Sequence, residues 1–152
     1  MRRTAHALPL DSSLFFKLVR VVNLTARPFV ETLAHTHQLS LNEWRVMVVL
    51  ASHPGIAARD LALATGLDKM SISRAIAALF RHGRLTKKAD EQDGRRTLLW
   101  LNAAGTRVFK TIGERAKARE AQLFGGVDAE ELQRLETVVD KLLNALSEAE
   151  QA

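Results

Sequence analysis

The sequence contains no cysteine. Disulfide bridges, thiolate metal sites and thiol-based redox sensing are therefore excluded within these 152 residues, and the composition suits a reducing cytosol. Long apolar runs are also missing, since no stretch approaches the roughly 20 residues that span a bilayer. Arg2 and Arg3 could begin a signal peptide, but its apolar core would be interrupted. The interrupting residues are Pro9, Asp11 and Lys17. We expect a cytoplasmic protein without a membrane partner.

Catalytic motifs are equally scarce. The sequence has no Walker loop, no GxGxxG fingerprint and no Ser-His-Asp order, so we expect neither an enzyme nor a cofactor. The one candidate metal cluster is His35, His37 and Glu43. Histidines two positions apart on a helix point in different directions, which argues against a metal site. A metal-dependent enzyme using His35 and His37 is kept as an alternative.

Basic residues are concentrated in the middle of the chain, whose net charge is +5. Residues 59 to 96 contain nine Lys and Arg against five Asp and Glu, whereas residues 97 to 152 contain seven against nine. A local basic excess is typical of a surface that contacts phosphates, and a solvated basic face is the alternative. A chain of this length can bury roughly 68–70% of its extended surface, which is enough for one domain.

Two short helices joined by a tight turn are predicted inside this basic region. Residues 56 to 64 have the composition and spacing of a short amphipathic helix. Gly66 can adopt positive φ, as a tight helix-to-helix turn requires. Asp68 is a good N-cap for a second helix from Lys69 to His82, and Gly83 is a natural stop.

The second helix is predicted to bury one face and to present the other to DNA. Ile72, Ile76 and Leu79 recur at helical spacing and mark the buried face. The outward side combines small residues, which let the backbone approach a groove, with cationic side chains long enough to contact the DNA. Its predicted DNA-binding residues are Lys69, Met70, Ser71, Ser73, Arg74 and Arg81, with Ala77 between them.

A β-hairpin is predicted to follow. Residues 85–88 and 95–101 are β-prone and flank a polar loop at 89–94. Asp93 stands two residues before Arg95, a spacing at which its carboxylate could hold the guanidinium in one geometry before it enters a minor groove. Leu99 and Leu101 should face the core. The predicted DNA-binding residues of this hairpin are Lys87, Asp93, Arg95 and Arg96.

Apolar helices flank the basic region. Residues 11–37 form a helical pattern around Pro28, which either kinks one helix, the interpretation we favour, or separates two. A helix at 41–52 is apolar nearly all round and should be buried. Residues 102–124 form a long helix, and Asp128 opens a capping box for another. The apolar face of the first pattern consists of Leu14, Leu18, Val21, Val22, Phe29 and Leu33.

The last helix carries a narrow apolar seam at alternating spacings of three and four residues, which suits packing along another helix. Its members are Leu132, Leu135, Val139, Leu142 and Leu146. An intramolecular partner would explain the seam almost as well as a second copy. We favour a homodimer, because the terminal helices are not needed to complete the small central core. The predicted dimer interface joins this seam to Leu14 and Leu18.

Five short motifs stand at fixed distances in the region from Leu41 to Gly105. They are Arg59-Asp60-Leu61-Ala62, Gly66-Leu67-Asp68-Lys69, Ser71-Ile72-Ser73-Arg74, Asp93-Gly94-Arg95-Arg96 and Leu101-Asn102-Ala103-Ala104-Gly105. With these motifs the region resembles the MarR family of bacterial transcription regulators. Two departures are Ala57, where the family often has a hydroxyl N-cap, and Asn102, which replaces a common Thr. Ala57 should cost about 1 kcal/mol of stability at the start of its helix, whereas Asn102 remains a competent cap.

The resemblance implies one mainly α domain over residues 1–152, with a small β-hairpin (α+β). A winged helix-turn-helix lobe would occupy about 41–101, and dimerisation helices about 11–37 and 103–148. The implied function is that of a homodimeric repressor, which binds double-stranded DNA at a pseudo-palindromic operator with recognition helices about 34–36 Å apart. The alternatives are a non-specific architectural DNA-binding protein and a helical adaptor that needs no wing arginines.

Proteins of this family commonly sense small aromatic or lipophilic anions between the dimer helices and the winged lobe. By this resemblance, Arg45 would supply a cation for an aromatic carboxylate. The apolar wall would consist of Phe16, Trp44 and Phe109. The competing interpretation places Trp44 in the core and makes Arg45 a structural ion-pair partner.

Overall fold

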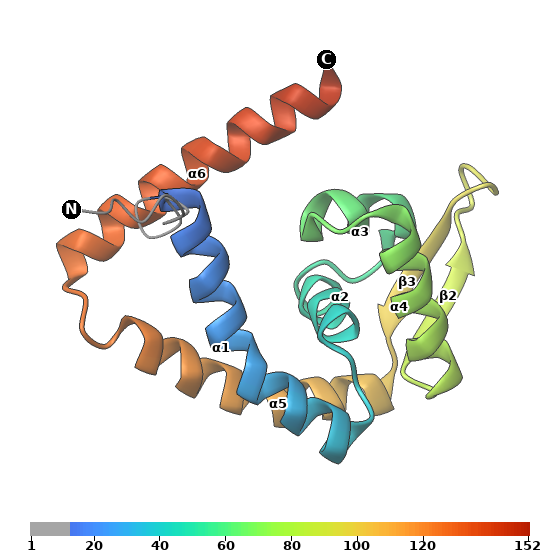
Figure 1. The fold of residues 1–152 in the computed structure, drawn as a ribbon. Coiled ribbons are helices and arrows are strands. Elements are labelled where there is room, and N and C mark those ends of the chain that lie inside the picture. The colour runs from blue at the N-terminus through green and yellow to red at the C-terminus, as the bar shows by residue number, and fades with distance from the viewer. Residues whose placement is uncertain (1–12) are drawn as a thin grey trace, which may run out of the picture. The chain divides into compact units, whose positions relative to one another are not determined.

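The computed structural model describes residues 13–152 and has six helices and three short strands in this range (Figure 1). This confirms the predicted mainly α fold with a small sheet. The chain divides into two compact units, one ending at Gly113 and the other running from Glu114 to Ala152. No helix within residues 13–152 is long and apolar enough to cross a membrane. The elements are α1 (Leu14–His37), α2 (Leu41–Ser52), β1 (Ile56–Ala57), α3 (Ala58–Thr65), α4 (Lys69–Arg81), β2 (Leu85–Ala89), β3 (Thr97–Leu101), α5 (Ala103–Phe124) and α6 (Ala129–Gln151).

Helix α1 continues through Pro28 as one element, so the two-helix alternative is wrong. It begins after Ser13, whose hydroxyl oxygen accepts a hydrogen bond from the backbone N–H of Phe16 at 3.2 Å. The predicted start at residue 11 lies outside the described residues, as do residues 2, 3 and 9. Only Phe29 and Leu33 of the predicted apolar face are buried. The remaining four members are exposed, namely Leu14, Leu18, Val21 and Val22.

Residues 56 and 57, predicted as helix, form strand β1 instead. Ile56 pairs with Leu99 and Ala57 pairs with Leu98, so β1 covers one edge of β3 and the sheet order is β1-β3-β2. Ala57 is also the N-cap residue of α3, with extended backbone and no side-chain hydrogen bond to the helix. Two residues are too few to show a strand period in a sequence, and their pairing depends on partners 43 and 41 positions later.

The ends of α4 follow the predicted signals. Gly66, at the end of α3, has φ of 72°, and Gly83, just after α4, has φ of 67°. Both values lie in the left-handed region that glycine adopts without steric cost. Asp68 caps the start of α4 by accepting a 2.8 Å hydrogen bond from the backbone N–H of Ser71. Helix α4 itself ends at Arg81, one residue earlier than predicted, because His82 is its C-cap.

In the hairpin, the first strand is one residue longer than predicted and the second is two residues shorter. β2 and β3 pair in the register Leu85 with Leu101 through Ala89 with Thr97. Arg95 and Arg96, which were predicted to begin the second strand, lie in the turn before it. The turn is closed by backbone hydrogen bonds that Asp90 and Arg96 donate to Arg96 and Asp93, respectively, each at 2.9 Å.

The core of the first unit lies among α2, α3, α4 and the sheet. Side chains from all of these elements are almost fully inaccessible, as is Ile112 of α5. Val48 of α2 is exposed, so the prediction that this helix is buried all round is wrong at that position. The predicted inward residue Leu99 is fully buried, while Leu101 is half-buried. The most inaccessible core residues are Val46, Met47, Leu50, Leu61, Leu79 and Leu99.

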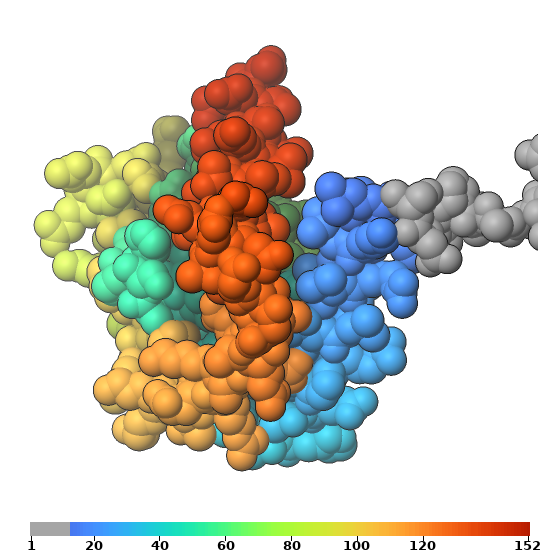
Figure 2. Space-filling view, turned by 90° about the vertical axis from the view of Figure 1, so that its left-hand side faces the viewer, coloured from blue at the N-terminus to red at the C-terminus, as the bar shows by residue number. Residues whose placement is uncertain are grey.

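The second unit contains the end of α5 and all of α6. Asp128 and Glu131 form the predicted capping box at the start of α6, with hydrogen bonds of 2.8 and 3.1 Å between side chains and backbone N–H groups. No residue of α6 is buried. The space-filling view shows the surface of this helix in orange and red (Figure 2). Its seam residues Leu135, Val139, Leu142 and Leu146 are all exposed, and Leu132 is half-buried.

Candidate nucleic-acid interface

Helix α4 separates an apolar face from a polar one, as its sequence predicts. Ile72, Ala75 and Leu79 are buried against the core, whereas Ile76 is half-buried. Met70 is 63% exposed, the largest apolar side chain on the outer side. The guanidinium of Arg74 folds back along the helix and donates a 3.4 Å hydrogen bond to the carbonyl of Met70. The other exposed residues of this face are Lys69, Ser73, Ala77 and Arg81.

Ser71 is part of the helix cap as well as of the outer surface. Its hydroxyl donates a 2.7 Å hydrogen bond to the second carboxylate oxygen of Asp68, and its backbone N–H binds the first. These two hydrogen bonds, the side-chain one first, hold the pKa of Asp68 below its ordinary value. The hydroxyl proton of Ser71 is therefore engaged within the protein, and its oxygen remains an acceptor.

A polar cleft extends the outer face of α4 toward the start of α2. It has a volume of about 400 Å³ and brings Arg74 and Arg81 close to Ser40 and Asn42. Two guanidinium groups beside polar groups at a helix N-terminus suit a backbone phosphate. Sequence reasoning missed Ser40 and Asn42, because they precede α4 by about 30 positions and carry no charge to mark them.

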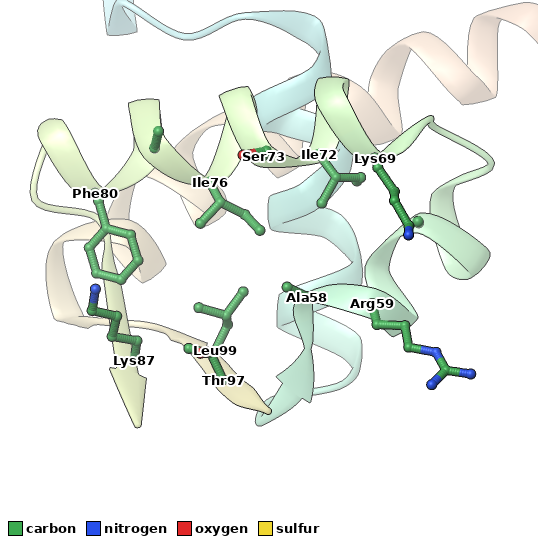
Figure 3. Close-up of a pocket in the computed structure, with 12 residues that line it drawn as sticks. Ala58, Arg59, Lys69, Ile72, Ser73, Ile76, Phe80, Lys87, Thr97 and Leu99 are labelled. Carbon is green, nitrogen blue, oxygen red and sulfur yellow. The ribbon is translucent and has the colours of Figure 1, made fainter. Parts of the chain in front are cut away.

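A second cavity lies between α4 and the sheet (Figure 3). Its volume is about 530 Å³, and Ile76 and Leu99 point toward each other across it. The amine of Lys87, a predicted DNA-binding residue, lies 5.0 Å from the centre of the Phe80 ring, in cation–π contact. Lys69 and Arg59 are at the opposite end of the cavity. Arg59 is an exposed cation that was not among the predicted DNA-binding residues.

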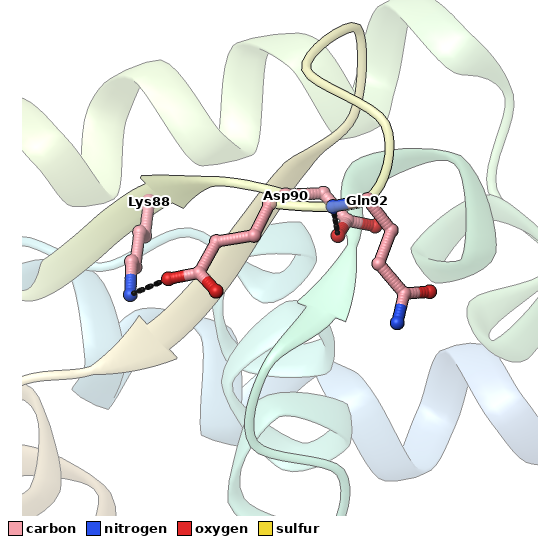
Figure 4. Close-up of polar contacts among 4 residues, drawn as sticks. Lys88, Asp90 and Gln92 are labelled. Atoms are coloured by element: carbon pink, nitrogen blue, oxygen red, sulfur yellow. Dashed lines mark hydrogen bonds and ion pairs between the residues drawn. The ribbon is translucent and has the colours of Figure 1, made fainter.

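Residues 90–96, which join β2 to β3, form the wing loop, and hydrogen-bond acceptors within the loop order it. The carboxylate of Asp90 accepts a hydrogen bond from the backbone N–H of Gln92 at 3.0 Å, and Lys88 forms a 3.1 Å ion pair with Glu91 (Figure 4). Asp93 accepts a 3.1 Å hydrogen bond from the backbone N–H of Arg95. The prediction that Asp93 holds the Arg95 guanidinium is therefore wrong, because its carboxylate shapes the turn instead. The Arg95 side chain is exposed.

Arg96 is tied to the helix-turn-helix rather than extended. Its guanidinium forms a 3.1 Å ion pair with Asp60 on α3, and both side chains are about half exposed. An exposed pair of this kind contributes about 0–1 kcal/mol of stability. Its structural consequence is that the wing loop and the start of α3 are joined across 36 positions of sequence.

Comparisons with known proteins identify this arrangement. The family model described as "MarR family" matches residues 37–96, which contain α2 to α4, β2 and the wing loop. The transcriptional regulator HosA of Escherichia coli O127:H6 is 26% identical over 106 residues, covering 70% of this chain and 78% of HosA. The family match and the curated relatives support a MarR family regulator.

Solved structures of MarR regulators share the whole fold. A MarR family transcriptional regulator from Silicibacter pomeroyi aligns with a TM-score of 0.83 at 21% identity, covering 95% of this chain and 97% of that structure. The PcaV transcriptional regulator from Streptomyces coelicolor, solved with its natural ligand, aligns with a TM-score of 0.75 at 25% identity, covering 93% and 99%. The fold is therefore that of MarR regulators, and the family match and curated relatives support a DNA-binding transcriptional regulator rather than an enzyme.

The expected effector residues of the MarR protein are only partly brought together. Trp44 is buried and stacks on Phe109 of α5, with ring centres 5.2 Å apart and planes at 20°. Phe29 also packs against Trp44 in a T-shaped arrangement, with ring centres 5.7 Å apart and planes at 75°. Trp44 is therefore a core residue, as the competing interpretation expected. Arg45 donates a 3.3 Å hydrogen bond to the side chain of Asn42, and Phe16 is half-buried near the start of α1.

The metal alternative gains no geometric support in this MarR protein. Within residues 13–152, no three His, Cys, Asp or Glu side chains are placed to hold a metal ion. Glu43, the third candidate ligand, instead accepts a 2.6 Å hydrogen bond from the backbone N–H of Ser40 in the capping box of α2. His35 and His37 lie in the last turn of α1.

Proposed function

We propose that this MarR-family protein is a homodimeric, sequence-specific repressor, which a small aromatic or lipophilic anion releases from DNA. The observation that carries the proposal is the outer face of α4, where cations and small side chains are exposed opposite a buried apolar face. A helix of this kind, capped and fixed by a core, suits insertion into a major groove.

Base contacts are assigned to two residues of α4 and one of the wing. Ser73 and Arg74 are exposed on α4 and reach the edges of bases in the major groove. Arg95, exposed in the wing turn, enters the adjacent minor groove, where narrow A·T-rich sequence attracts arginine. Phosphates are contacted by Lys69 and Arg81, and these contacts fix the register of the protein on the duplex.

The dimer is assigned to the terminal helices. Leu14 and Leu18 on α1 are 70% and 40% exposed, and the seam of α6 lies on a helix with no buried residue. Exposed leucines and valines repeated at helical spacing bury apolar area when a second copy packs against them. A two-fold axis then presents two α4 helices to a pseudo-palindromic site.

An effector is supported by one relative and by two places in the structure. PcaV was solved with a natural ligand, and an apolar ligand with one charge suits a protein cleft lined by aromatic residues and a cation. Arg45, which follows Trp44 on α2 and is hydrogen-bonded to Asn42, is the first place. The second is the cavity between α4 and the sheet, which has Lys87 and Lys69 at its edge.

Selection of bound duplexes from a random-sequence pool tests the proposal. A sequence-specific dimer enriches two related half-sites at one spacing, and the enriched duplex outcompetes unrelated DNA at the same salt concentration. An architectural protein enriches no sequence and is competed equally by both. A helical adaptor shows no binding that depends on Arg95. Either of the last two results would overturn the assignment.

A further inference from the structure

Arg84 follows the end of α4 and is one of two buried charged residues within the described chain, with an exposed fraction of 8%. Its guanidinium donates hydrogen bonds to the backbone carbonyls of His37 and Gln38 at the end of α1, the second at 3.5 Å. Burial of a charge is costly unless it is hydrogen-bonded. The carbonyl end of a 24-residue helix carries partial negative charge, which makes it a favourable partner for a cation.

The backbone of Arg84 joins two further elements. Its N–H donates a 2.9 Å hydrogen bond to Leu79 of α4, and its carbonyl accepts a 3.1 Å hydrogen bond from Asn102, just before α5. The Asn102 side chain also binds both the carbonyl of Gly83, at 2.8 Å, and the N–H of Gly105 in the first turn of α5, at 2.9 Å. One residue therefore connects the end of α4 to the end of α1 and the start of α5.

The approach of α5 to this residue is close. A Cβ atom at Gly105 would lie 2.2 Å from the Arg84 carbonyl oxygen, a distance at which backbone must move. Glycine is thus required by proximity at this position. The Arg84 backbone is in tight contact with α5, and the Arg84 side chain is hydrogen-bonded to α1. A displacement of α1 or α5 is therefore transmitted to α4 rather than absorbed locally.

We propose that Arg84 is a positioning residue that fixes the recognition helix to the dimerisation helices and thereby sets the spacing of the two α4 helices on DNA. This inference rests on the proposed homodimer. The residue itself is buried and touches no DNA. Its contribution is to keep the second half-site at a high effective concentration once the first is bound, because the two helices are then held at the operator spacing.

The test compares wild type, Arg84→Met and Arg107→Met on duplexes derived from the selected site. One probe has a single half-site, one has both at the selected spacing, and one has both separated by about five further base pairs, roughly half a helical turn. For Arg84→Met we expect unchanged half-site affinity and about a tenfold smaller preference for the selected spacing, within the range of couplings between sites. Arg107→Met removes the same charge from an exposed position of α5 and should behave as wild type.

Two further variants keep the test decisive if Arg84→Met does not fold, as judged by circular dichroism. Arg84→Lys can still reach one carbonyl and should restore part of the spacing preference. Gly105→Ala pushes on the same junction from α5 and should reduce that preference while leaving half-site binding intact. Equal loss on half-sites and full sites, or an unchanged spacing preference, overturns the role of Arg84. Wild type without any spacing preference overturns the homodimer proposal itself.

Discussion

Arg96 and Asp60 join the wing to the helix-turn-helix through a 3.1 Å ion pair. The pair places one of the two wing arginines in a structural role, while Arg95 beside it remains exposed. We expect Asp60→Asn to weaken DNA binding slightly, because the wing loop loses its anchor, and to change the free energy of unfolding by no more than about 1 kcal/mol. Fluorescence anisotropy on the selected duplex measures the first effect. An increase in affinity would instead show that Arg96 contacts phosphates once it is released.

Arg74 and Arg95 are expected to affect specificity in different ways. Arg74→Ala should cost about 1–3 kcal/mol of binding and relax the preference at one base position, because a major-groove contact to a base edge is lost. Arg95→Ala should reduce affinity mainly for sites with A·T-rich flanks, where the minor groove is narrow. Titrations on duplexes with A·T and G·C flanks measure both. Equal affinity of Arg95→Ala and wild type on both flanks would contradict the wing assignment.

The α6 seam is expected to be dry in the dimer. Leu135→Asp and Leu142→Asp would bury an unpaired carboxylate there, which is strongly unfavourable, so the variants should dissociate or unfold and lose full-site binding. Asn144→Asp adds the same charge on an exposed position outside the seam and is the matched control. Light scattering at micromolar concentration gives the mass. A wild-type monomer under these conditions is incompatible with the interface.

The cap of α4 should make stability depend on pH. The Ser71 hydrogen bonds lower the pKa of Asp68 in the folded protein, so this carboxylate stabilises the fold above its unfolded pKa, and the contribution is lost as the pH falls through its folded pKa. The difference in unfolding free energy between wild type and Asp68→Asn should therefore shrink from about pH 4 downward. Ser71→Ala removes the side-chain hydrogen bond that contributes most to the lowered pKa of Asp68. It should therefore narrow the pH range over which the stabilisation by Asp68 is lost. Denaturation curves measure the unfolding free energies of wild type and Asp68→Asn. A difference between them that stays constant from neutral to acidic pH would disprove the link between this carboxylate and stability.

Arg45 provides the test of the effector. An aromatic carboxylate that weakens operator binding tenfold corresponds to about 1.4 kcal/mol of coupling, and DNA must weaken ligand binding by the same factor. Arg45→Met keeps the length of the side chain and removes the charge, so it should abolish the response and leave unliganded DNA binding intact. Operator titrations with a panel of aromatic acids measure this. An unaltered response in Arg45→Met together with its loss in Lys87→Met would move the site to the cavity beside α4.

Local signals explain why much of the fold was predictable. The Asp68 cap and the glycines at 66 and 83 act through backbone geometry within a few residues, and the periodic apolar residues of α4 determine which side is buried. The same features predicted the outer face of α4, because a helix that buries one side must expose the other. The two β-prone runs on either side of a polar loop predicted the hairpin that carries Arg95 and Arg96.

Long-range pairing explains what the sequence could not show. Strand β1 exists because its two residues meet the free edge of β3, and Arg96 turns to Asp60 because the folded chain brings the wing loop to α3. The amine of Lys87 contacts the Phe80 ring. Asp93 is a local exception, because its carboxylate accepts a hydrogen bond from the backbone N–H of Arg95 in its own turn. In each case the side chain could pair with several residues of suitable chemistry, so the sequence does not identify its partner.

The sequence by itself determined the helices, their caps, the turn glycines and the basic outer face of α4, because these depend on neighbours within one or two helical turns. Only the tertiary structure decided that Arg84 is buried against the end of α1, that Trp44 stacks on Phe109 and that Gly105 lies against the Arg84 carbonyl. The physical reason is that a side chain selects its partner by proximity in space, which for residues 47 or 65 positions apart is set by the packing of the whole unit.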